Sequence, residues 1–270
     1  MKQKHLKVIA LLTLVVWLFG CVRVPISNRR QVNLLPESEL IGMSMTAYAD
    51  FLSTNAVVGD HDREAQLVQQ VGTRIAGAVT DYMRDHGMSR RIANFAWEFN
   101  LVNDPTVNAW CMPGGRVVFY RGILPVCQDE TGIAVVMGHE IAHAVARHGN
   151  ERMSQQLIVQ AGGATLAVLM QEKPALVQDL FFMSYGVGSS LGALAFSRQH
   201  ETESDKLGLV FMAMAGYDPS EAPSFWERMA AQSGGGAPPE FLSTHPSHET
   251  RISDLKAFLP EAMKYYKPKN

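Results

Sequence analysis

The pattern of apolar and polar positions predicts a chain built mainly of helices. Apolar residues recur at helical spacing over residues 62–84, which predicts an amphipathic helix packed on a core. A shorter helix is expected over residues 40–52. Residues 131–148 contain no proline and are rich in small and apolar side chains, so they predict a buried helix. Two more helices are expected over residues 207–214 and 220–231.

A strand pattern occupies the middle of the chain. Residues 95–102 alternate between apolar and polar side chains, as half-buried strands do. Residues 107–112 and 117–120 flank Pro113-Gly114-Gly115, which predicts a hairpin turn. The expected fold class is therefore α+β and mostly helical, with a small antiparallel sheet beside the helix over 131–148.

Composition agrees with one globular domain and excludes one class of partner. The 270 residues are 47% hydrophobic and 19% charged, which suits a single domain with a sizeable core. The formal net charge of −2 lacks the basic footprint of a nucleic-acid-binding protein. We therefore expect no nucleic-acid partner.

The N-terminus predicts export from the cytoplasm. Lys2, Lys4 and Lys7 precede the apolar run 8–19, which is short for a transmembrane helix and typical of a secretory signal. The run ends in Gly20-Cys21, which resembles a bacterial lipobox, so Cys21 is the expected lipidation site. Ordinary secretion and an uncleaved anchor are the alternatives.

This reading divides the chain into three parts. Residues 1–20 are expected to be a signal peptide, 21–36 a lipid-anchored tether, and 37–264 the folded domain. Several acyl chains together make a stable membrane anchor. Val22 follows the cysteine, and by resemblance to bacterial lipoproteins this predicts an outer-membrane protein facing the periplasm.

The strongest chemical signal is His139-Glu140-Ile141-Ala142-His143. Residues four apart share one face of a helix, so His139 and His143 can direct two imidazoles at one metal ion. Glu140 projects from nearly the same edge, where a general base would act. The alternative is a helix with two ordinary histidines, and the apolar neighbours count against it because buried ionisable groups need partners.

A second acidic segment can supply a third metal ligand. Glu201 and Asp205 are four apart, on one face of a predicted helix. Glu201 can complete a His-His-Glu site, and Asp205 can accept a hydrogen bond from a ligand histidine. Glu203 is the rival ligand, but it points about 200° away from Glu201. A solvated acidic face is the alternative for the whole segment.

These motifs together resemble a known family. His139–His143 followed by the segment 197–205 is similar to the CAAX prenyl endopeptidase type (HtpX-like) of zinc metallopeptidase, in its periplasmic lipoprotein branch. The segment 108–117 resembles the family's edge strand, and Thr244-His245-Pro246 with Arg251 resembles its C-terminal element. The resemblance covers roughly residues 37–260. It implies a zincin-like core with one zinc ion held by His139, His143 and Glu201.

The resemblance also implies roles for residues around the metal. Asn108 and Ala109 would lie on an exposed strand edge that binds an extended peptide substrate, although simple turn chemistry also explains Asn108. His245 would either stabilise the oxyanion of the reaction or bind zinc in place of water. Arg251 would anchor its loop to a carboxylate or contact the substrate.

Two cysteines remain after Cys21. Cys111 lies in the predicted sheet and Cys127 just before the helix of the metal motif, so a disulfide would join the two. Two buried free thiols are the alternative.

The expected function is a zinc metalloendopeptidase of protein quality control. It would cleave unfolded or misassembled proteins at the cell envelope, with envelope assembly machinery as a further partner and Glu140 as general base. The main alternative is an assembly chaperone or binding lipoprotein with little proteolysis. A zinc esterase or amidase acting on cell-wall peptides also fits the site residues.

Overall fold

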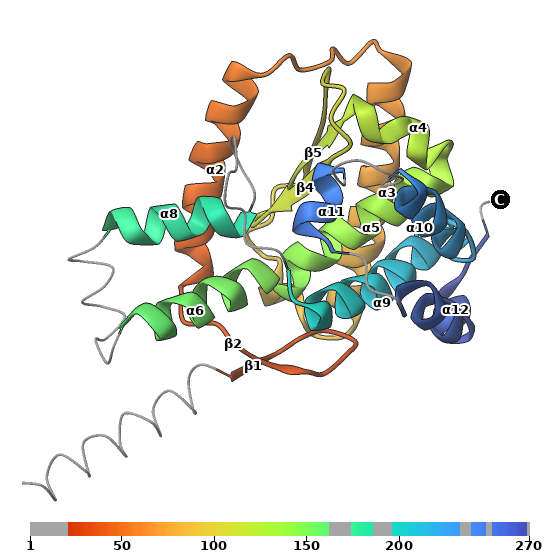
Figure 1. The fold of residues 1–270 in the computed structure, drawn as a ribbon. Coiled ribbons are helices and arrows are strands. Elements are labelled where there is room, and N and C mark those ends of the chain that lie inside the picture. Colours follow the sequence, from red (N-terminus) through yellow and green to blue (C-terminus); the bar gives the residue numbers. More distant parts are fainter. Residues whose placement is uncertain (1–20, 162–173, 186–195, 233–238, 247–249, 269–270) are drawn as a thin grey trace, which may run out of the picture.

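A computed structural model of the chain describes residues 21–161, 174–185, 196–232, 239–246 and 250–268. In that part of the chain the fold is α+β and mostly helical, as predicted (Figure 1). The signal peptide predicted over residues 1–20 lies outside the described residues, so that prediction and the lipidation of Cys21 stay untested. None of the described helices is both long and apolar enough to span a membrane.

The helices predicted from apolar spacing form close to the expected positions. α2 covers Glu37–Thr54 and α3 covers Arg63–Asp85. Asp62 begins α3, because its side chain accepts hydrogen bonds from the first free backbone N–H groups. The face of α3 with the helical apolar repeat is buried, and it packs against the sheet and α5 (Glu130–Ala146).

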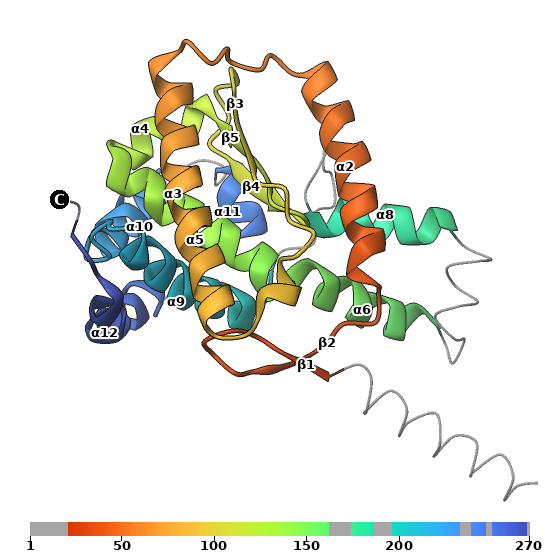
Figure 2. The ribbon, with the colours of Figure 1, turned by 180° about the vertical axis from the view of Figure 1, so that it is seen from behind.

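The remaining helices surround α5 and complete the two core regions. α6 (His148–Ala161) and α8 (Pro174–Tyr185) pack with α2 over one side of the sheet. α9 (Arg198–Met214), α10 (Glu221–Ala231) and α12 (Arg251–Ala262) pack around α5 on the other side (Figure 2). Short helical turns α4 (Leu124–Cys127) and α11 (Glu240–Thr244) flank the site, and three single 3₁₀ turns cover Ser89–Arg91, Arg121–Ile123 and Met263–Tyr265.

The central sheet differs from the all-antiparallel one that was predicted. Its strands are β3 (Glu98–Val102), β4 (Ala109–Met112) and β5 (Arg116–Tyr120), in the order β3-β5-β4. The hairpin β4–β5 is antiparallel, but β5 returns between the other two strands and so pairs with β3 in parallel. Strand alternation locates each strand but not its neighbour, and this is why the sequence pattern missed the parallel pair.

The segment predicted as a tether is packed against the domain. β1 (Cys21–Arg23) and β2 (Arg30–Val32) pair antiparallel in what we call the N-terminal hairpin, residues 21–32. Val24 is 1% exposed and Gln31 2% exposed, so both are buried against the domain. Arg91 donates to the Arg23 carbonyl and to the last carbonyls of α5, at Val145 and Ala146. The hairpin therefore docks at the C-terminal end of the helix that carries the metal motif.

Candidate metal centre

The two helices that carry the metal motifs cross at a pair of glycines. Gly138 on α5 lies against the backbone of Gly208 on α9. A methyl group on Gly138 would lie 2.8 Å from the Gly208 oxygen, and one on Gly208 would lie 2.9 Å from the His139 nitrogen. The backbones can therefore approach so closely only because both positions are glycine, and this brings His139 to the helix that carries Glu201.

Four buried side chains direct donor atoms at one point. They are His139, His143, Glu201 and His245, and all four donor atoms lie within 4.8 Å of one another. His139 Nε2 is 3.1 Å from His143 Nε2 and 3.2 Å from His245 Nδ1. Glu201 Oε1 is 3.1 Å from His245 Nδ1 and 3.3 Å from His143 Nε2. A tetrahedral zinc ion with bonds near 2.0–2.1 Å separates its ligand atoms by about 3.3 Å, so the spacing fits zinc.

Hydrogen bonding prepares His139 for a cation. Its Nδ1 lies 3.0 Å from Asp205 Oδ1, and because a carboxylate only accepts, this nitrogen carries the hydrogen. Nε2 then faces the cluster, where a metal ion would take the place of a proton. Burial lowers the pKa of His139, but its bonds to Asp205 and Glu201 outweigh burial and raise the pKa to about 9. The two carboxylates thus favour positive charge at this point. The roles of Glu201 as a ligand and of Asp205 as the partner of His139 stay predictions, with which these contacts agree.

Glu140 is placed for acid–base chemistry beside the cluster. It is 2% exposed, and its Oε1 lies 3.4 Å from His245 Nε2. Burial raises the pKa of the Glu140 carboxyl above its usual value, which suits a group that must both take and return a proton. His245 therefore sits between the metal donors and the predicted general base.

Arg251 supports the ligands and is buried. Its side chain is 0% exposed, with Nη2 donating to Asp205 Oδ1 at 2.7 Å and Nη1 lying 3.1 Å from Glu201 Oε2. The guanidinium lies over the Trp226 ring, 3.2 Å from its centroid. Of the two predicted roles, these contacts agree with anchoring to a carboxylate, and a buried side chain disfavours a contact with substrate, which stays an untested prediction.

The predicted substrate edge lines a narrow cavity beside the cluster. Asn108 and Ala109 border it together with Glu140, His143 and His245, and its volume is about 30 Å³. Ala109 begins the edge strand β4, but Asn108 is only 4% and Ala109 1% exposed. Their role in binding a peptide stays a prediction, and it requires the neighbouring segments to move.

The disulfide predicted between Cys111 and Cys127 does not form. Both cysteines are free and buried, so the alternative of two free thiols is correct. Cys111 borders the narrow cavity, and its thiol contacts the Met112 carbonyl oxygen. Burial raises the pKa of both thiols, which keeps them protonated and unreactive.

Comparison with known proteins decides the family. The profile of peptidase family M48 matches residues 63–259, which include every residue of the metal cluster. The chain belongs to peptidase family M48. The membership confirms the predicted zinc metallopeptidase class, and together with the donor set it confirms zinc as the cofactor.

Several proteins with sequences similar to this chain are named as metalloendopeptidases. Mitochondrial metalloendopeptidase OMA1 of Schizosaccharomyces pombe is 36% identical over 242 residues, which cover 88% of this chain and 66% of the relative. Human OMA1 is 29% identical over 264 residues, covering 94% and 49%. The beta-barrel assembly-enhancing protease of Escherichia coli K12 is 29% identical over 191 residues, covering 66% and 38%. The chain thus spans less than two thirds of each relative's own length.

The predicted location is wrong. Five relatives, from two yeasts, a plant, cattle and human, carry mitochondrial names, which contradicts an assignment as a bacterial outer-membrane lipoprotein. That assignment depended on a short basic and apolar segment and on the single dipeptide Gly20-Cys21. Such a local pattern is a far weaker signal than similarity over most of the chain.

Sequence reasoning missed a second polar cluster next to the metal centre. It consists of Arg29 on the N-terminal hairpin, His148 and Glu151 on α6, and His200 and Glu203 on α9. Glu203 does not join the metal donors, as its predicted direction required, but bonds to His148 and Arg29. In the sequence, the position of His148 five residues after His143 is the feature that could have indicated this cluster. No sequence pattern indicated that Arg29 belongs to it.

The stability of the protein at acidic pH tests the contribution of the Glu151 carboxylate to this second cluster. Burial raises its pKa, but hydrogen bonds from Arg29 and His200 outweigh burial and lower the pKa from 4.5 to about 2. A carboxyl group whose pKa is lower in the folded than in the unfolded chain stabilises the fold at pH values above its unfolded-state pKa of 4.5. This contribution is lost as the pH falls from 4.5 toward 2. Glu151→Gln should therefore lower the free energy of unfolding by about 2 kcal/mol near neutral pH.

The pH dependence distinguishes this effect from a simple packing defect. The difference between wild type and Glu151→Gln should be constant above pH 4.5 and shrink below it, because Gln has no proton to gain. Urea unfolding at several pH values, with chelator present for both proteins, measures the difference. A difference that stays constant through this acidic range would show that the ion pair with Arg29 contributes nothing.

Proposed function

We propose that this chain is a zinc-dependent endopeptidase that cleaves unfolded or misassembled proteins. The observation that supports this most is the cluster of four metal-donor atoms with the buried Glu140 beside it. The names of the OMA1 relatives support an endopeptidase, and the name of the bacterial relative, a beta-barrel assembly-enhancing protease, supports β-barrel proteins in assembly as one substrate class.

The narrow site supports a flexible substrate. His139, Glu140 and His143 are each at most 3% exposed, and the adjoining cavity of about 30 Å³ has room for little more than water. The surface of a folded protein cannot reach these groups, whereas an extended segment can enter beside an edge strand once the site opens. Within the described residues β4 pairs with β5 alone and is therefore an edge strand, and its residues Ala109–Cys111 line the same cavity as Glu140.

The proposed mechanism assigns a task to each side chain. Zinc, when bound, lowers the pKa of water and polarises the scissile carbonyl. Glu140 takes the proton from the attacking water and returns it to the leaving amine. Asp205 holds the ring of His139, and Arg251 fixes Glu201 and Asp205 together. His245 provides the fourth donor, so substrate entry requires its imidazole to leave the cluster.

Metal removal tests the proposed function directly. We expect the purified chain to cleave casein, to lose cleavage to background when a strong chelator removes the metal, and to regain it when one equivalent of zinc is returned. Metal content is measured by mass spectrometry on the same samples. One zinc per chain without cleavage of casein or of flexible peptides would count against an endopeptidase and favour a binding protein.

A further inference from the structure

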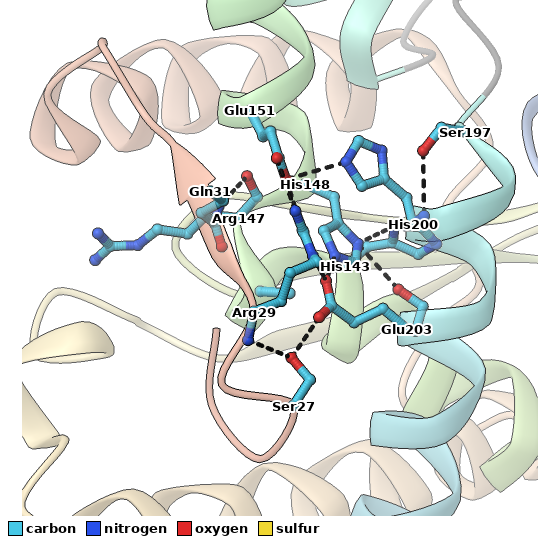
Figure 3. A network of polar contacts seen from close by, with 12 residues as sticks. Ser27, Arg29, Gln31, His143, Arg147, His148, Glu151, Ser197, His200 and Glu203 are labelled. Carbon is cyan, nitrogen blue, oxygen red and sulfur yellow. Dashed lines mark hydrogen bonds and ion pairs between the residues drawn. The ribbon is translucent and has the colours of Figure 1, made fainter. Parts of the chain in front are cut away.

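One cation from the N-terminal hairpin holds two buried carboxylates of the domain (Figure 3). The Arg29 guanidinium donates to the two Glu151 oxygens at 2.8 and 2.6 Å, and its Nε donates to Glu203 Oε2 at 2.8 Å. The Ser27 hydroxyl donates to the other Glu203 oxygen. The Glu151 and Glu203 side chains are 7% and 5% exposed, so without Arg29 two buried negative charges would lack their cation.

Glu203 in turn fixes the hydrogen on His148. His148 is 0% exposed, and its Nε2 lies 2.9 Å from Glu203 Oε2. Because a carboxylate only accepts, His148 Nε2 carries the hydrogen. A neutral imidazole has one donor and one acceptor nitrogen, so in the neutral ring Nδ1 is then the acceptor.

His148 then fixes the hydrogen on a zinc ligand. Its Nδ1 lies 3.0 Å from His143 Nδ1, so the His143 nitrogen must donate. The Ser204 hydroxyl lies 3.1 Å from the same His148 nitrogen and shares it. With its hydrogen on Nδ1, His143 keeps the lone pair of Nε2 for the metal. His139 obtains the same orientation directly from Asp205.

We propose that the N-terminal hairpin is a positioning element of the zinc centre. Arg29 and Ser27 hold Glu203, Glu203 fixes the tautomer of His148, and His148 holds His143 with its Nε2 lone pair toward the metal. Among the described residues Arg29 contacts no metal donor and does not line the narrow cavity beside Glu140, so it acts through the residues between. The inference requires the zinc centre but not the proposed substrate.

Zinc affinity is the property that Arg29 should control. Removal of such an outer hydrogen-bond partner typically weakens metal binding by roughly 10–100-fold, and we expect this loss in Arg29→Gln. Competition with a chromophoric chelator measures the affinity, and the visible spectrum of the cobalt-substituted protein reports the geometry of His143. Both readouts are independent of proteolysis, so failure of the protease proposal would leave them intact.

Arg228→Gln is the matched control. The Arg228 side chain is 23% exposed, against 17% for Arg29, and it pairs with one glutamate, Glu221 at 2.8 Å, where Arg29 pairs with two. Its other partners are carbonyl oxygens of α4, at Val126 and Cys127. This variant should lose folding stability without a change in zinc affinity or in the cobalt spectrum. If Arg29→Gln behaves in the same way, the hairpin is only structural and the proposal is wrong.

A pair of substitutions at His148 tests the last step of the relay. His148→Leu removes the acceptor for His143 Nδ1, whereas the side-chain oxygen of His148→Asn can take nearly the same place. We expect the leucine variant to lose zinc affinity by roughly 10–100-fold and the asparagine variant to recover most of it. Equal zinc affinities for the two variants would overturn the role assigned to His148.

Discussion

Replacing Glu140 by glutamine is expected to lower proteolysis by roughly 10²–10⁴-fold while one zinc ion stays bound. Glu140 is not one of the four clustered donors, so its loss leaves the metal ligands in place. Glutamine has nearly the same shape but cannot take a proton from water. Initial rates of casein cleavage and metal content, measured on the same preparation, test both halves of this prediction.

Glu130→Gln provides the matched control for this experiment. Glu130 lies at the start of the same helix, α5, and accepts a hydrogen bond from the Tyr217 hydroxyl, which a glutamine oxygen can also accept. Activity should therefore be close to that of the wild type. Undiminished proteolysis in Glu140→Gln would remove Glu140 from the mechanism. Loss of zinc in Glu140→Gln would instead show that its carboxylate supports the metal site.

Replacing His245 by alanine is expected to raise proteolysis about tenfold or more. In the structure His245 Nδ1 lies 3.2 Å from His139 Nε2 and 3.1 Å from Glu201 Oε1, within the set of metal donors. A fourth protein ligand occupies the position that a catalytic site leaves to water. If the open form is a minor state of 0.1–10%, as is common for such equilibria, removing the competing ligand increases the active fraction accordingly.

The opposite result is equally informative about His245. If His245→Ala retained zinc but lost activity, the imidazole would act on the oxyanion, where a lost donor slows catalysis by about 10²–10³-fold. The double variant Glu140→Gln/His245→Ala is the control, and it should be inactive whichever role His245 has. The measurement is kcat/KM for a flexible fluorogenic peptide, with zinc content determined for each variant.

Much of the site follows from residue spacing, because its parts lie on helices. The i, i+4 pairs His139–His143 and Glu201–Asp205 each needed only one helical turn to be placed, and each pair does lie on one helix, α5 or α9. α2 and α3 formed near their predicted bounds because each presents an apolar face.

The features that the sequence did not predict depend on long-range contacts. The parallel pairing of β3 with β5, the docking of the N-terminal hairpin and the burial of Arg251 against Glu201 all join segments that local patterns treat separately. Arg251 and Arg29 resemble ordinary surface arginines in the sequence. Only the fold shows that buried carboxylates surround each of them.

The crossing of α5 and α9 at Gly138 and Gly208 also determines when the zinc site can exist during folding. His139 and Asp205 are 66 residues apart in the chain, so the pair meets only after a long loop has closed. Contacts of such range generally slow folding. The His139–His143 motif therefore has its third ligand, Glu201, only after the two helices have docked. Tight zinc binding would report that this docking is complete.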